Sequence, residues 1–71
     1  MNFYIIRNDS DDVVDCLTSS PHAVAEANKH GPGTSIDLCE CPVIAETIRL
    51  MLAQKGGYAT NFKTIYEVPT P

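Results

Sequence analysis

Four short runs in this 71-residue chain are rich in β-branched and aromatic residues, a composition typical of strands. They cover residues 2–7, 13–18, 34–41 and 62–68. The turn-forming stretch 8–12 separates the first two runs, so we expect these to form an antiparallel hairpin.

Two further segments carry helix signals. Ser19-Ser20-Pro21 offers a capping hydroxyl and a proline suited to the first helical turn, which predicts a helix as far as about His30, where Gly31 follows. Pro42 opens a second predicted helix that runs to about Lys55 before two glycines. Both helices therefore have marked beginnings and ends.

The second predicted helix is apolar on more than one side. Its core-facing stripe is expected to hold Ile44, Ile48, Met51 and Leu52, with Lys55 at the rim. Val43 and Leu50 fall outside that stripe. Either the sheet curls around this helix, or a binding partner covers the remaining apolar side.

The predicted order of elements is ββαβαβ, which defines an α+β fold. We expect one domain over residues 1–71, because a chain of this length supports a single core. The simplest solution is a two-layer sandwich, in which a four-stranded, mainly antiparallel sheet carries both helices on one face. The helical crossovers also permit some parallel strand pairing.

Composition indicates an intracellular protein. The chain has an odd number of cysteines, namely Cys16, Cys39 and Cys41, and no apolar leader precedes the first predicted strand. A secreted scaffold held by disulfides is therefore not expected. The longest apolar stretch, at residues 43–53, contains charges and is too short to span a bilayer. These features predict a cytoplasmic protein that does not bind membranes.

The net charge of −4 is unevenly distributed. Residues 1–48 hold eight acidic and two basic residues, whereas residues 49–71 hold one acidic and three basic residues. An acidic surface repels phosphate backbones, so we expect no direct nucleic-acid binding and favour a basic protein partner. The candidate partner-binding residues are the acids of the first hairpin and the surplus apolar positions of the second helix: Asp9, Asp11, Asp12, Asp15, Val43 and Leu50.

Cys39 and Cys41 are the strongest candidates in the chain for a chemically reactive pair. Both thiols project from the same side of the predicted strand, and Cys41 lies at the entry to the second helix, where a thiolate is stabilised. His22 and His30 lie far apart along the first predicted helix and do not complete a zinc site with them. We therefore predict no bound metal, and a thiol- or metal-responsive module remains an alternative.

The sequence contains no catalytic or phosphate-binding motif. The glycine clusters at residues 31–33 and 56–57 stop helices and lack the lysine of a phosphate-binding loop. The serines at residues 19 and 20 are placed to cap a helix. We expect no enzyme activity and no cofactor.

The opening strand Phe3-Tyr4-Ile5-Ile6-Arg7, the acidic turn and the Ser-Pro-capped, alanine-rich helix resemble small orphan proteins of bacteriophages and mobile elements, of the anti-CRISPR kind. The resemblance is one of size, acidity and layout. It implies a non-catalytic inhibitor that covers a basic nucleic-acid-handling complex in the host cytoplasm. A structural homodimer, paired through the last strand or the second helix, is the other expectation.

Overall fold

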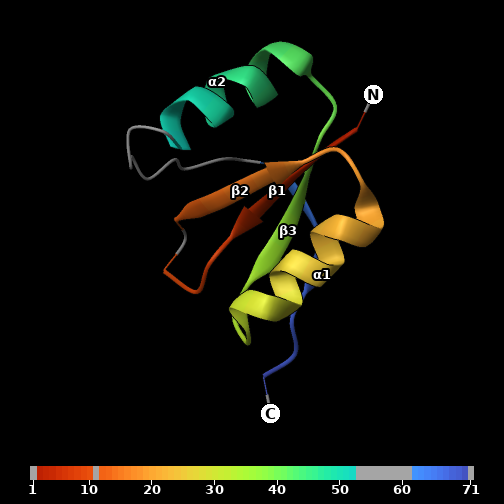
Figure 1. Cartoon of the computed structure of the whole chain (residues 1–71), viewed down its shortest axis with the longest axis vertical. Helices are drawn as coiled ribbons and strands as arrows, with labels where there is room; N and C mark the ends of the chain where they lie inside the picture. Colours follow the sequence, from red (N-terminus) through yellow and green to blue (C-terminus); the bar gives the residue numbers. More distant parts are fainter. Residues whose placement is uncertain (1, 11, 53–61, 71) are drawn as a thin grey trace.

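The computed structural model describes residues 2–10, 12–52 and 62–70. Figure 1 shows the six elements of this part of the chain: β1 (Phe3–Arg7), β2 (Val13–Leu17), α1 (Ser20–His30), β3 (Ser35–Cys39), α2 (Pro42–Leu52) and β4 (Lys63–Glu67). The predicted ββαβαβ order and the α+β class are confirmed. The predicted end of the second helix at Lys55 lies outside the described residues.

The four strands form one sheet in the order β2-β1-β3-β4, and all neighbouring strands in it are antiparallel. The connection from β2 through α1 to β3 makes these two strands parallel in direction. β1 lies between them, however, and pairs with both. The mainly antiparallel sheet is therefore confirmed, and the permitted parallel pairing does not occur between the described strands.

The two helices pack on opposite faces of this sheet. Ile5 lies in a buried cluster with Ile48 of α2, whereas Ile6 lies in a second cluster with Ala27 of α1. Consecutive strand residues point to opposite faces, so the two clusters are on different sides of β1. Figure 1 likewise shows the strands running between the two helices.

The expected sandwich with both helices on one face is wrong for a physical reason. β1 carries apolar side chains on both of its faces, as a strand in the middle of a sheet covered on both sides does. One helix covers the face of Phe3 and Ile5, and the other covers the face of Tyr4 and Ile6. The result is three layers, with β1 and β3 at the centre.

A buried ion pair ties three strands together on the α2 side of the sheet. Asp37 of β3 is fully buried, and its Oδ2 lies 2.7 Å from Nε of Arg7 on β1. Nη2 of Arg7 donates to Oδ1 of Asp37 at 3.2 Å, and the hydroxyl of Thr64 on β4 donates to the same oxygen at 2.7 Å. This network fixes β1, β3 and β4 relative to one another.

Candidate protein-binding surface

The outer face of α2 exposes large aliphatic side chains. The side of the helix that meets the sheet is fixed by Ala45 and Ile48, which are fully buried. Val43 is 74% exposed and Leu50 is 62% exposed. With Thr47 they follow the i, i+4, i+7 spacing of one helix face, on the side opposite Ala45 and Ile48. We call Val43, Thr47 and Leu50 the outer stripe.

The predicted core stripe of this helix is rotated in the structure. Ile44 was expected in the core but is 37% exposed, while Ala45 is buried in its place against the cluster that holds Phe3 and Cys16. A small residue at the contact lets the helix approach the sheet closely, which periodicity of large apolar residues does not reveal. The prediction that Val43 and Leu50 lie off the core is confirmed.

The two charged residues of α2, Glu46 and Arg49, lie three positions apart on one flank of the helix. Glu46 directly precedes Thr47 in the helix and is exposed beside the outer stripe. The charge of Arg49 acts on Cys16 of β2, and so does the charge of Glu46. Burial raises the pKa of the Cys16 thiol, and the nearby Arg49 guanidinium partly opposes that rise. Both charged side chains are exposed, so this flank of α2 presents an acid and a cation together.

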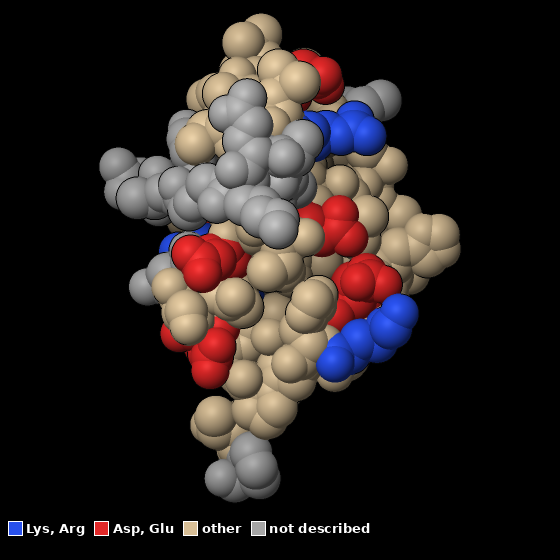
Figure 2. All heavy atoms as spheres, turned by 60° about the vertical axis from the view of Figure 1, so that its left-hand side comes forward, with Lys and Arg blue, Asp and Glu red and all other residues tan. Residues whose placement is uncertain are grey.

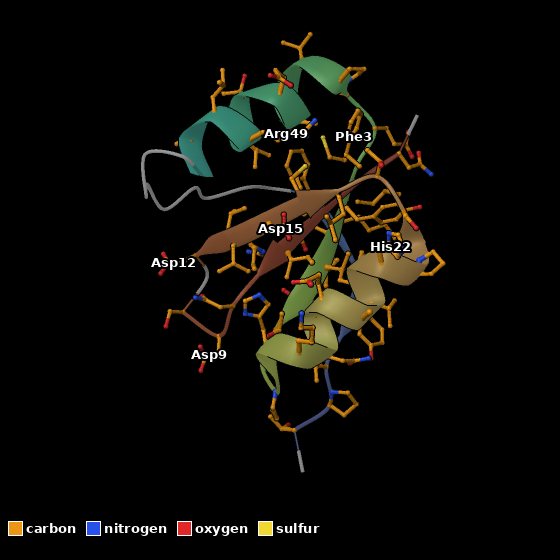
Figure 3. All side chains as sticks on the ribbon, in the orientation of Figure 1. Phe3, Asp9, Asp12, Asp15, His22 and Arg49 are labelled. Carbon is orange, nitrogen blue, oxygen red and sulfur yellow. The ribbon has the colours of Figure 1, made fainter. Side chains whose placement is uncertain are left out.

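The predicted acidic residues of the first hairpin occupy a different part of the surface. Asp9 and Asp12 are exposed in the turn between β1 and β2, and Asp15 is half-buried on β2 (Figure 3). Oδ1 of Asp15 accepts a hydrogen bond from the backbone amide of Cys16 at 2.8 Å. Asp11 lies outside the described residues. The structure thus brings Val43 and Leu50 together but holds these acids apart from the outer stripe.

Asn8 forms hydrogen bonds with described residues on both sides of the acidic turn. Oδ1 of Asn8 accepts hydrogen bonds from the amides of Ser10 and Asp12, both at 3.0 Å, and the Asn8 amide donates to the Asp12 carbonyl at 2.9 Å. A Cβ placed on Gly33 would lie 2.7 Å from Cβ of Asp9, so the turn also packs closely on the α1–β3 loop. Asp9 and Asp12 are both exposed next to these contacts, and Figure 2 shows several acidic side chains on this side of the molecule.

Cys39 and Cys41 differ in their exposure to solvent in the structure. β3 ends at Cys39, which is buried and whose thiol donates to the Cys41 carbonyl at 3.4 Å. Cys41 follows the strand and is exposed. All three cysteines are free thiols, and no group of three metal-ligating side chains occurs among the described residues.

None of the described helices is long and apolar enough to cross a bilayer. Comparison of the chain with protein families, with curated proteins and with solved structures gives no match. The function of the surface is therefore inferred from its own chemistry.

Proposed function

We propose that this chain is a non-catalytic protein-binding module whose apolar contact is the outer stripe of α2. The observation that carries the proposal is the exposure of Val43 and Leu50 on a helix that is already anchored through its opposite side. A helix needs only one apolar face to pack on a sheet. A second apolar face, rimmed by polar residues, is typical of a surface that another protein covers.

The partner is expected to be basic. The chain has nine acidic residues against five basic ones, and two of the basic side chains, Arg7 and Lys29, already pair with Asp37 and Glu26. Charge complementarity speeds association and disfavours partners of like charge. The more specific form of the proposal is an anti-CRISPR-like inhibitor, which covers the nucleic-acid-binding surface of a basic host complex. Acidity and small size support this form.

A structural homodimer paired through β4 is the second candidate. β4 lies at the edge of the sheet, and Ile65 in its middle is 43% exposed. However, Ile36 pairs with Tyr66 and Asp37 with Thr64, which leaves Ile65 as an extra residue in β4. Such a bulge bends an edge strand and opposes regular pairing with another strand. The β4 edge is therefore a weaker candidate than α2.

The deciding experiment is affinity capture of the tagged chain from host lysate, repeated with matched surface variants. The double variant Val43→Ser/Leu50→Ser removes the outer stripe, and Ile65→Ser removes an exposed aliphatic side chain on β4 as the control. We expect the wild type and the control to recover the same basic protein complex, and the double variant to lose it.

The acidic turn is tested separately with Asp9→Asn/Asp12→Asn, which keeps the size of both side chains. We expect a slower association that becomes insensitive to salt, because exposed charges act mainly on the encounter of two proteins. Equal recovery by wild type and the stripe variant would contradict the proposal. A native mass showing only a dimer of the chain would favour the homodimer.

A further inference from the structure

We infer that Asp15 closes the β2 edge of the sheet against pairing with the same strand of a second copy of this chain. Its carboxylate holds the backbone amide that an added strand would need. β2 has β1 as its one neighbour among the described strands, so its outer side is an edge of the sheet. Edge strands offer unpaired backbone groups to other chains, and proteins use charged side chains and bulges to block them. The inference is independent of the outer stripe.

The backbone of Cys16 points to that edge. The amide of Asn8, the residue after β1, donates to the Asp12 carbonyl at 2.9 Å and so points toward β2. Consecutive residues of a strand direct their backbone groups to alternate sides, so Ile6 also points toward β2 while Ile5 points toward β3. Cys16 lies opposite Ile5. The backbone groups of Cys16 therefore face away from β1.

The side chain of Asp15 occupies this outward amide. Asp15 is half-buried, and its Oδ1 accepts the hydrogen bond of the Cys16 amide at 2.8 Å. A hydrogen bond to an ionised acceptor is roughly twice as strong as one between neutral groups. A strand that approaches the edge has to displace this carboxylate before its own carbonyl can accept the amide. Asp15 thus competes directly with strand pairing.

Cys16 is the residue of β2 at which this competition matters most. The pairing with β1 skips Val14, and such a bulge disrupts regular pairing at the start of the strand. Residues 15–17 keep a regular register with β1, and Cys16 is the one of these three whose backbone faces outward. A second copy presents the same regular segment, so two β2 edges could pair about a two-fold axis once the carboxylate is removed.

Sedimentation velocity over a range of concentrations tests the inference with variants of the full chain. Asp15→Ala removes the acceptor, whereas Asp15→Asn keeps an amide oxygen that can accept the same hydrogen bond. Asp12→Ala changes the net charge equally at an exposed position of the turn. We expect Asp15→Ala to self-associate at least about tenfold more tightly than the wild type. We expect Asp15→Asn and Asp12→Ala to behave as the wild type does.

Amide hydrogen exchange of Cys16, followed by NMR, locates the contact. We expect this amide to be protected in the monomeric wild type and to exchange at least about tenfold faster in dilute Asp15→Ala. At high concentration of Asp15→Ala the protection should return, because a strand of the second copy then accepts the amide. Adding Val43→Ser/Leu50→Ser to Asp15→Ala should leave the association intact, since the outer stripe takes no part in it.

Far-UV circular dichroism and a melting curve establish that each variant folds. If Asp15→Ala fails this check, Asp15→Val replaces it, because a β-branched residue without an acceptor suits a strand. Self-association no tighter than that of the wild type would overturn the inference. Equal association of Asp15→Ala and Asp12→Ala would do so too, because net charge would then be the cause.

Two further outcomes would also count against Asp15 as the residue that closes the edge. Association of Asp15→Asn as tight as that of Asp15→Ala would show that the hydrogen bond to Cys16 is not what blocks pairing. Association that disappears with Val43→Ser/Leu50→Ser would place the contact on α2 instead of β2. An unprotected Cys16 amide in the wild type would overturn the inference without any variant.

Discussion

Replacing Asp37 with alanine should be among the most destabilising single changes on the α2 side of the sheet. The carboxylate is fully buried and is reached by the Arg7 guanidinium and the Thr64 hydroxyl. Removing it takes away the carboxylate that pairs with the Arg7 guanidinium, whose side chain is only 19% exposed. It also removes the acceptor of Thr64.

The size of the effect follows from these contacts. Breaking a buried ion pair by deleting one partner costs about 3–5 kcal/mol. A domain of this length has a free energy of unfolding of about 4–11 kcal/mol, at about 0.05–0.15 kcal/mol per residue. Asp37→Ala should therefore remove between about a quarter of the stability and all of it. Thr64→Val, which deletes one hydrogen bond to the charged acceptor, should cost about 1.5–3 kcal/mol.

Urea unfolding followed by circular dichroism measures both changes. The informative comparison is Arg7→Met/Asp37→Leu, which replaces the whole pair by apolar side chains. Such replacements of buried pairs are often neutral or stabilising. We expect the double variant to be clearly more stable than Asp37→Ala. A cost below about 1 kcal/mol for Asp37→Ala, or a double variant no more stable than the single one, would refute the buried pair as described.

Three further predictions concern the loops and the thiols. Gly33 has a φ of +88°, and a Cβ added to it would lie 2.7 Å from Cβ of Asp9, so Gly33→Ala should lower the free energy of unfolding in urea by about 2–4 kcal/mol. Asp9→Gly in the Gly33→Ala background should recover only the steric part of this loss. Strictly additive effects of the two changes would disprove the contact. A thiol reagent at neutral pH should modify the exposed Cys41 fast, whereas the buried Cys16 and Cys39 should react only on unfolding. Cys41→Ser should therefore abolish the fast phase of the reaction. Equal reaction rates for the three thiols would contradict the burial of Cys16 and Cys39. Burial raises the pKa of Cys16 in the folded chain, so the unfolded thiol ionises at a lower pH than the folded one. The free energy of unfolding should therefore be unaffected by this thiol at low pH and should fall as the pH rises above about 8.5. Cys16→Ala should flatten that slope in pH-dependent unfolding, and an unchanged slope would show that another group is responsible.

The candidate site was predictable where it depends on helix periodicity. Val43 and Leu50 were expected off the core because spacing along a helix fixes which residues share a side, and both are exposed. Ile44 was misplaced because spacing does not fix which side meets the sheet. That choice was made by the small side chain of Ala45, which lies against the buried face of β1 and β2. The partner remains a prediction.

The sequence by itself determined the elements and their order, because strand composition, turn residues, proline and glycine act within a few residues of where they occur. Only the tertiary structure decided the strand order, the placement of α1 and α2 on opposite faces, and the burial of Asp37. An aspartate in a strand is usually exposed, and the partners that permit its burial, Arg7 and Thr64, are 30 and 27 residues away. Contacts over such separations form only when the strands meet in the folded sheet, so no local pattern in the chain records them.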